Sequence, residues 1–203
     1  MVPLFDKCLE KDLFMHILET TRLILRPPSH GDELLLHGLH SDPFVANAIG
    51  DGACPTREQS KAALLRFMND WQHNGFGFWM VFVKSEGRSK FAGYCGLACS
   101  GQNLPEDPNN VELVYCVHLA ASGKGIAPEA GRAAIRFAFE YLALEQVTAF
   151  IRRTNTRSLR AAPKVGLCYI RDRIYNNMMM GYFEAAPVTV VKTEVLRVSP
   201  CAK

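Results

Sequence analysis

Short apolar runs along the chain predict most of its strands. Residues 22–26 alternate apolar and mostly polar side chains until Pro27-Pro28 stops the run. Two denser runs of aromatic and β-branched residues, 76–83 and 91–98, flank a turn at Glu86-Gly87-Arg88 and predict an antiparallel hairpin. The remaining strands are expected at 111–118, 147–151, 167–175 and 188–198.

Apolar residues at helical spacing predict four helices between these strands. Ser29 precedes Asp32-Glu33 and a leucine-rich run, as is typical of an N-cap followed by an acidic first turn. Thr56 opens a second helix, which Asn74-Gly75 ends. The other two helices are expected at 126–144, which carries the longest apolar stripe, and at 155–165.

The order of these elements predicts a mixed α/β domain. Residues 111–151 run from strand through a glycine-rich turn and a helix to another strand, so this βαβ unit should hold two parallel strands beside the antiparallel hairpin. The apolar residues of 178–183 are expected to pack in the core or in a loop. A chain of 203 residues corresponds to little more than one domain, and we expect a leader over 1–18 and a single domain over 19–200.

Composition and charge narrow the functional classes. With 48% apolar and 21% charged residues the chain is typical of globular proteins, which excludes wholesale disorder and a coiled coil. A net charge of +3 is too balanced to indicate a nucleic-acid groove or a polybasic membrane anchor. There is no signal-peptide pattern and no run approaching the roughly 18 apolar residues of a membrane span. We expect a cytoplasmic protein that binds neither nucleic acid nor membrane.

The seven cysteines indicate free thiols rather than disulfides or metal ligands. Their number is odd and no two form a C-x-x-C pair, which favours a reducing compartment. Cys95 and Cys99 lie in an apolar run, where small buried cysteines are common. No metal site is therefore expected.

The most informative segment is the glycine-rich turn that leads from a strand through Gly123 and Gly125 into the longest helix. Such a turn offers unpaired N–H groups and the positive end of the helix dipole, which together bind a phosphate. It is no Walker loop, because Lys124 is followed by glycine, and no Rossmann fingerprint, because Pro128 takes the place of the third glycine. On spacing alone, the turn could equally serve only to connect strand and helix.

The turn and several other segments form a pattern along residues 21–170. The run Ser122-Gly-Lys-Gly-Ile-Ala127, followed by Glu129-Ala130, is the central piece. The supporting segments, in chain order, are Thr21–Arg26, Gly77-Phe-Trp79, residues 92–97, Asn155-Thr-Arg-Ser158 and Lys164-Val-Gly166. Together they resemble the GNAT acetyltransferase superfamily, and within it the RimJ/RimL-like N-acetyltransferase branch. The resemblance implies a GNAT-like fold with flanking helices and about seven strands, mostly antiparallel, around a central parallel βαβ unit.

The resemblance also implies acetyl-CoA as cosubstrate, without a metal. Its pyrophosphate would lie on the N–H groups of residues 123–127, and its pantetheine arm would pair with the adjacent strand like an added strand. Asn155 resembles a family residue that contacts the pantetheine or positions the next helix, and it could equally be an N-cap. Ser122 stands where the family often has Arg or Gln, and Pro128 removes one donor. The implied binding residues are Cys116, Val117, Ser122, Gly123, Lys124, Gly125, Ile126, Ala127 and Asn155.

Acetyl transfer to an amine needs a base for the proton and a donor for the leaving thiolate. Glu112 is our first choice of base, because the branch often carries a Glu there; the alternative is an exposed polar residue that starts a strand. Many GNAT enzymes carry a Tyr seven residues after the motif Asn, where this chain has Ala162. We expect Ser158 to replace it as general acid, the alternative being a local cap. Pro163 could kink the same helix.

These residues predict an N-acetyltransferase that moves an acetyl group directly from the coenzyme to a primary amine. The acceptor could be a protein N-terminus or a small molecule, and the enzyme a monomer or a homodimer. Ala162 and Ser122 leave open a non-catalytic acyl-CoA-binding or interaction module on the same fold.

Overall fold

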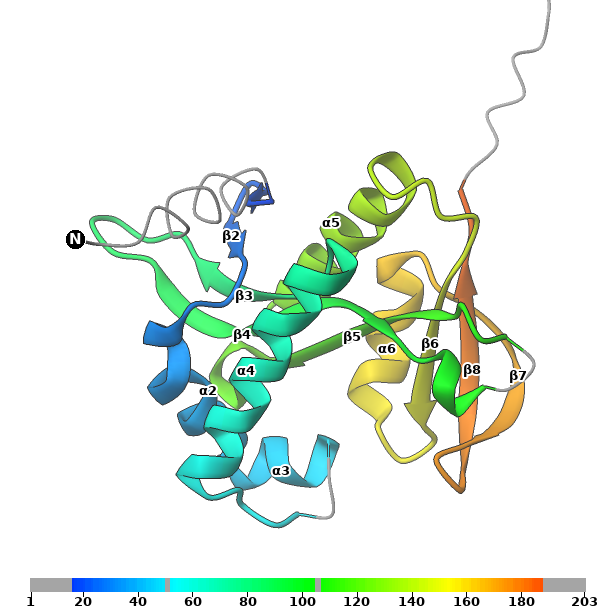
Figure 1. Ribbon diagram of the computed structural model, residues 1–203, viewed down its shortest axis with the longest axis horizontal. Helices are drawn as coiled ribbons and strands as arrows, with labels where there is room; N and C mark the ends of the chain where they lie inside the picture. Colours follow the sequence, from blue (N-terminus) through cyan, green and yellow to red (C-terminus); the bar gives the residue numbers. More distant parts are fainter. Residues whose placement is uncertain (1–15, 50–51, 105–106, 188–203) are drawn as a thin grey trace, which may run out of the picture.

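An eight-stranded sheet with the order β1-β2-β3-β4-β5-β6-β8-β7 forms the centre of the protein (Figure 1). The computed structural model describes residues 16–49, 52–104 and 107–187. Neighbouring strands run antiparallel except β5 and β6, which run parallel as the βαβ unit predicts. The strands are β1 (Leu18–Glu19), β2 (Leu23–Arg26), β3 (Phe78–Val83), β4 (Lys90–Cys99), β5 (Val111–Val117), β6 (Val147–Arg152), β7 (Cys168–Tyr175) and β8 (Met178–Ala185).

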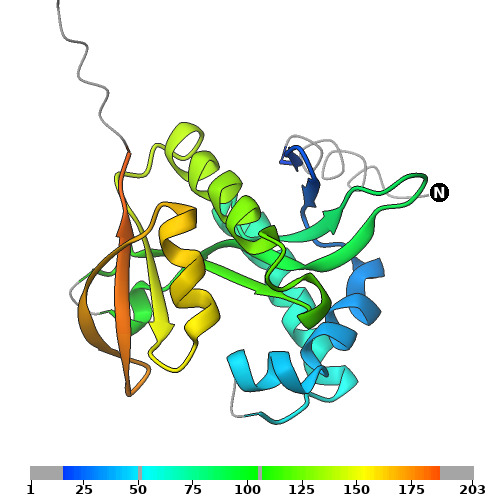
Figure 2. The same ribbon diagram turned by 180° about the vertical axis from the view of Figure 1, so that it is seen from behind.

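Helices cover both faces of this sheet. In Figure 1, α4 lies on the near side and α5 and α6 on the far side, which Figure 2 turns toward the viewer. Residues of α2 and α3 pack with α4 in one apolar cluster. Within the described ranges, no helix is both long enough and apolar enough to cross a membrane. The helices are α2 (Glu33–His40), α3 (Pro43–Ile49), α4 (Arg57–Asn74), α5 (Ile126–Glu140) and α6 (Thr156–Val165), with short 3-10 turns η1 (His30–Asp32), η2 (Gly101–Asn103) and η3 (Leu119–Ala121).

The two faces of β5 contact different apolar clusters. Leu113, Tyr115 and Val117 pack in the larger cluster, to which α5 and α6 contribute. Val114 and Cys116 pack in the smaller cluster beneath α2, α3 and α4. This alternation is the period of two of an extended strand, and it makes β5 the element shared by both layers.

Capping residues predicted from the sequence begin α4 and α6, whereas Ser29, predicted as the N-cap of the first helix, precedes the 3-10 turn η1, and Asp32 precedes α2. Thr56 accepts a hydrogen bond from the N–H of Gln59 and the Gln59 side chain accepts one from the N–H of Thr56, which closes a capping box at the start of α4. Gly75, with φ of +72°, ends the same helix. The Asn155 side chain accepts from the N–H of Ser158 and caps α6. The N-caps predicted from the sequence are confirmed for both helices.

Strand β8 is the main correction to the sequence prediction. Residues 178–183 were expected as core or loop packing, but 178–185 form a strand that pairs with both β6 and β7. With the short strand β1, which begins within the expected leader, it brings the described sheet to eight strands instead of about seven. Asn176 and Asn177 adopt φ of +50° and +58°, as the two central residues of a tight hairpin require. The strand expected at 188–198 lies outside the described residues.

Two helices also differ from the prediction. Residues 43–49 form α3, which the sequence analysis did not predict. The helix expected over 126–144 ends at Glu140. Ala143 adopts a left-handed conformation with φ of +51°, and the N–H of Leu144 donates to the carbonyl of Ala138, so the chain turns away from the helix axis there.

Candidate functional site

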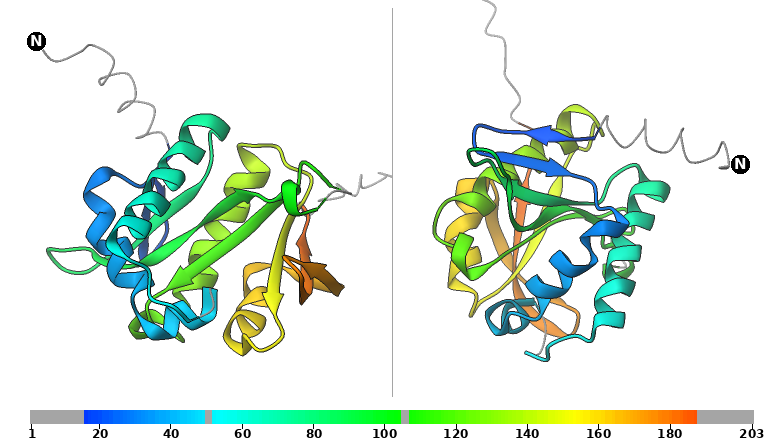
Figure 3. Two further views of the ribbon diagram at one scale, coloured as in Figure 1. Left: turned by 60° about the horizontal axis from the view of Figure 1, so that its bottom comes forward. Right: turned by 90° about the vertical axis from the view of Figure 1, so that its left-hand side faces the viewer.

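The site is built where β5 and β6 separate. The two strands pair through one register contact, Glu112 with Thr148, and then diverge, as the left view of Figure 3 shows. A buried network fixes this contact, because the Asn110 side chain donates to Oγ of Ser100 at 2.6 Å and to Oγ1 of Thr148 at 2.9 Å. Residues 113–117 keep their ladder with β4, while their other edge faces the gap. Alternate backbone groups on that edge can therefore pair with an extended ligand.

A cavity of about 1060 Å³ occupies the gap and reaches both faces of the sheet. On one face it is lined by the glycine-rich turn and by α6, and on the other by residues of α2, α3 and α4 such as Phe44 and Phe67. The charged side chains along it are mostly basic. They are Arg66, Arg152, Arg157, Arg160, Lys164 and, as the acid, Glu112.

The glycine-rich turn closes one end of the cavity. Gly123 and Gly125 have φ of +75° and +77°, a region that favours glycine. The first N–H groups of α5 have no acceptor within the helix and carry the positive end of its dipole. The turn therefore has the geometry of a phosphate cradle. Of the predicted cofactor residues, Lys124 does not line the cavity, whereas the others do: Cys116, Val117, Ser122, Gly123, Gly125, Ile126, Ala127 and Asn155.

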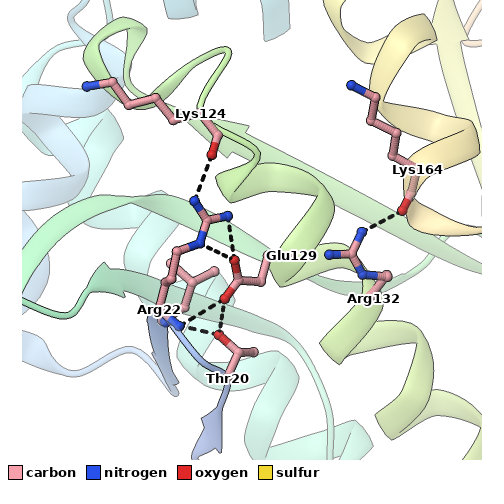
Figure 4. Close-up of polar contacts among 7 residues, drawn as sticks. Thr20, Arg22, Lys124, Glu129, Arg132 and Lys164 are labelled. Carbon is pink, nitrogen blue, oxygen red and sulfur yellow. Dashed lines mark hydrogen bonds and ion pairs between the residues drawn. The ribbon is translucent and has the colours of Figure 1, made fainter.

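Arg22 and Glu129 brace this turn (Figure 4). Nη1 of Arg22 donates to the carbonyl oxygen of Lys124 at 2.9 Å, and Nε donates to Oε2 of Glu129 at 2.7 Å. The other carboxylate oxygen accepts from the Thr20 hydroxyl at 2.5 Å and from the N–H of Arg22 at 3.0 Å. Burial raises the pKa of Glu129, but these hydrogen bonds outweigh it and hold the pKa below its ordinary value. The turn is thus tied to the β1–β2 edge of the sheet by an ionised carboxylate.

Glu112 is buried, with 8% of its surface exposed, so the alternative of an exposed residue at the strand start is wrong. Burial raises the pKa of its carboxyl from 4.5 to about 7. Hydrogen bonds from Tyr175, whose hydroxyl donates to Oε2 at 2.8 Å, and from the backbone of Phe150 oppose that rise. A carboxyl that lines a cavity and titrates near neutrality can accept a proton from a bound ligand.

Ser158 lies in the first turn of α6, where two contacts hold the backbone. Its N–H donates to Oδ1 of Asn155 at 3.1 Å, and its carbonyl accepts from the Tyr115 hydroxyl at 3.3 Å. Ser158, Asn155 and Tyr115 are half-buried and line the cavity. The helix runs on through Pro163 to Val165. The structure therefore brings Ser158 and Glu112 to one cavity, Glu112 from β5 and Ser158 from α6.

The thiol of Cys116 is not suited to nucleophilic chemistry. Burial raises its pKa to about 12, so it stays protonated at neutral pH. Cys95 is also buried, whereas Cys99 is exposed, in part contrary to the expectation for that run. Among the residues that the structure describes, no cluster of His, Cys, Asp or Glu could hold a metal ion.

The hydrogen bond of Tyr175 to Glu112 and the contact between Arg22 and Glu129 were not predicted from the sequence. Tyr175 follows Glu112 by 63 positions, and no local motif marks it. Arg22 and Glu129 lie 107 positions apart, although each belongs to a segment that resembles the family. The joint presence of those two segments was the available signal for this contact.

Comparisons with known proteins agree with this geometry. The family described as acetyltransferase (GNAT) domain matches residues 22–167. The uncharacterized protein YkkB of Bacillus subtilis strain 168 is 27% identical over 158 residues, which cover 75% of this chain and 85% of that protein. A putative GNAT-family acetyltransferase from Bordetella pertussis is 24% identical and similar in structure, with a TM-score of 0.71 over 84% of this chain and 99% of that one. RimL, a ribosomal L7/L12 α-N-protein acetyltransferase in complex with coenzyme A, is 12% identical, with a TM-score of 0.68 over 84% of this chain and 98% of that one.

Proposed function

The chain belongs to the GNAT acetyltransferase family and is an acyltransferase, and from this we propose that it transfers the acetyl group of acetyl-CoA directly to a primary amine. One observation carries the proposal. The cavity between β5 and β6 joins a phosphate cradle at Gly123–Gly125 to a buried carboxyl, that of Glu112. Coenzyme A bound to the similar RimL structure supports the choice of donor.

Acetyl-CoA is proposed to enter from the face of α5 and α6. Its pyrophosphate would bind the N–H groups of residues 123–127, and its pantetheine arm would pair with the open edge of β5 at Cys116 and Val117. These contacts use main-chain atoms, so Ser122 suffices where the family often has Arg or Gln. Arg160 and Lys164 line the same side of the cavity from α6 and would attract the phosphate groups.

The acceptor amine is proposed to enter from the opposite face. There α3 and α4 line the cavity with Phe44, Val45, Ala63 and Phe67, which give this half an apolar wall. A donor and an acceptor on opposite faces can occupy the cavity together, which favours direct transfer in a ternary complex. The acceptor would be the N-terminus of a protein or the amine of a small molecule.

Two side chains of the cavity would carry the proton transfers. Glu112 would accept a proton from the amine, directly or through a water, while the amine nitrogen bonds to the thioester carbonyl carbon. When the C–S bond breaks, the hydroxyl of Ser158 would donate a proton to the leaving thiolate, and the proton taken up by Glu112 would return through water to the Ser158 oxygen. The products are an acetamide and free coenzyme A. Tyr115 and Asn155 would keep Ser158 in place through their bonds to its backbone.

Ligand-induced stabilisation tests the donor site first. A ligand at one hundred times its dissociation constant adds about 2.7 kcal/mol to the free energy of unfolding. We expect acetyl-CoA and coenzyme A to raise the melting temperature and ATP to have little effect. Incubation with acetyl-CoA and a panel of primary amines, read by mass spectrometry, should then give an acetylated product. No shift with either coenzyme would contradict the proposal.

The variant Glu112→Gln tests the assigned base. It should lower kcat by roughly 10²-fold or more and leave the dissociation constant of coenzyme A nearly unchanged, because the amide cannot accept the proton. Glu145→Gln is a matched control, since Glu145 is exposed and does not line the cavity. Unchanged turnover in Glu112→Gln would remove Glu112 from the mechanism.

A further inference from the structure

Arg22 does not line the cavity, yet its guanidinium contacts the turn that forms the cradle (Figure 4). Building on the proposed function, we propose that Arg22 is a positioning residue for the coenzyme: it holds the carbonyl of Lys124 so that the N–H of Gly125 faces the pyrophosphate. Arg22 would then act on the coenzyme through the backbone of the turn, without contact to it.

The geometry of the peptide bond links these two groups. Among the described residues every peptide bond is trans, and in a trans peptide the C=O of one residue and the N–H of the next point in opposite directions. Nη1 of Arg22 fixes the Lys124 carbonyl on the side of the β1–β2 edge, at 2.9 Å. The N–H of Gly125 must therefore point away from Arg22. Gly125 lines the cavity and Lys124 does not, so the side away from Arg22 is the side of the coenzyme.

Glu129 makes the guanidinium a fixed anchor. Its carboxylate accepts from Nε of Arg22 at 2.7 Å, and Nη2 lies 2.5 Å from the same oxygen. Thr20 holds the second oxygen, and the Thr20 hydroxyl in turn accepts from the N–H of Leu23 at 2.9 Å. The guanidinium of Arg22 thus donates to Glu129 and to the carbonyl of Lys124 at the same time, which the single ammonium of a lysine could not reproduce.

The ion pair between Arg22 and Glu129 also sets the charge next to the turn. Glu129 lies in the first turn of α5, next to the proposed pyrophosphate site, and 13% of its side chain is exposed. Without a cation beside it, this carboxylate would repel the phosphates. Arg22 would therefore contribute by orienting the Lys124–Gly125 peptide and by neutralising Glu129, and a double variant separates these two effects.

The test compares the dissociation constant of coenzyme A among variants by calorimetry, together with their melting temperatures. Arg22→Met should weaken binding about ten- to hundredfold, the value of a charge-assisted hydrogen bond, and raise KM for acetyl-CoA more than it lowers kcat. Arg22→Lys should keep the melting temperature near that of the wild type, since the ammonium can pair with Glu129, and still bind weakly. The double variant Arg22→Met with Glu129→Gln should regain only the part of the loss that comes from repulsion by Glu129 and stay weaker than the wild type, because neutralising Glu129 does not reorient the peptide.

Arg132→Met is the matched control. Nη1 of Arg132, on α5, donates to the carbonyl of Lys164 at 2.7 Å, which is the same kind of arginine-to-carbonyl bond but reaches α6 instead of the turn. It should leave the dissociation constant close to that of the wild type. An equal loss in Arg132→Met, wild-type binding in Arg22→Met, or full recovery to wild-type binding in Arg22→Lys or in the double variant would each overturn the proposal. Failure of the proposed function differs from all of these, because the wild-type protein itself would then not bind coenzyme A.

Discussion

At the scale of single residues, the environment of Glu112 sets both the pKa of its carboxyl and the effect of that carboxyl on the stability of the folded protein. The folded-state pKa of about 7 lies above the ordinary value of 4.5. Between these two pH values the folded protein keeps a proton that the unfolded chain has released, so the contribution of Glu112 to stability falls as the pH rises through this window. The burial of Glu112 therefore lowers the free energy of unfolding at neutral pH, as is common for carboxyl groups in functional sites.

Tyr175→Phe should move the pH dependence of the reaction upward. The Tyr175 hydroxyl donates to Oε2 of Glu112 and favours the ionised carboxylate, so its loss raises the pKa of Glu112 further. A hydrogen bond to a charged group and 1.36 kcal/mol per pKa unit give a shift of about one unit. In a profile of kcat/KM for the acceptor against pH, the inflection expected near 7 in the wild type should appear nearer to 8, with lower activity at pH 7. An unchanged inflection would mean that Glu112 does not limit the rate.

Local motifs predicted the residues of the cradle, whereas the residues that contact the site over long distances along the chain became apparent only in the folded structure. Gly123 and Gly125 are recognisable because a phosphate-binding turn needs its glycines at fixed positions in a short segment. Tyr175 and Arg22 act through contacts that span more than sixty positions along the chain, and a single sequence carries no signal for such a pair. Glu112 is intermediate, because family resemblance indicated the position while only the fold reveals its burial.

At the scale of elements, an irregularity in β4 allows β5 to come close. The β3–β4 pairing shifts its register between Val81 and Phe82, and Gly93 opposite this shift has φ of +146°. A Cβ on Gly93 would lie 2.0 Å from the carbonyl oxygen of Cys116, which is backbone and cannot turn aside. The position requires glycine for two reasons, its φ and its space.

Gly93→Ala should therefore destabilise the protein by more than about 1 kcal/mol, measured as a lower midpoint of urea denaturation. Coenzyme binding should weaken as well, because the displaced residue is the one whose backbone we assign to the pantetheine arm. Gly38→Ala provides a control of opposite sign: Gly38 lies within α2 and an added Cβ meets nothing within 4 Å, so alanine should stabilise by about 0.5–1 kcal/mol. A neutral Gly93→Ala would show that β4 can relax.

Elements with strong local signals were predictable, and those without them were not. The helix α4 was predicted together with both its ends, because Thr56 and Gly75 are typical capping residues. Strand β8 was missed because its run of methionines lacks alternation, although Asn176-Asn177 before it is a plausible hairpin turn. The seven residues of α3 are too few for a helical period to emerge.

At the scale of the whole molecule, the divergence of β5 and β6 opens a passage through the sheet. The α5 and α6 layer and the α2, α3 and α4 layer each bury one face of the sheet, and the cavity opens through it where only Glu112 and Thr148 pair. In the function that we propose, donor and acceptor would then meet at the strand edge without passing one another. Pairing of β5 and β6 along their full length would close this route. The hydrogen bonds of Asn110 with Ser100 and Thr148 hold the two strands together next to the single pair that they form.

The charge along this passage predicts a preference among acceptors. Apart from Glu112, the charged residues that line it are basic, and Arg66 on α4 lies on the acceptor side. Clefts of one sign raise the local concentration of oppositely charged ligands, so an amine with a nearby carboxylate should react faster than its neutral counterpart. Peptide amides with the sequences alanine-aspartate-alanine and alanine-asparagine-alanine isolate this effect, because they differ only in that charge.

At low ionic strength we expect kcat/KM to be about tenfold higher for the aspartate peptide, with a smaller difference at 0.5 M salt, where the Debye length is only a few Å. Arg66→Gln should reduce the preference without changing KM for acetyl-CoA. Lys61→Gln, which removes a charge from the same helix outside the cavity, should not alter it. Equal rates for the two peptides, or a preference that survives in Arg66→Gln, would show that the basic residues serve the coenzyme alone.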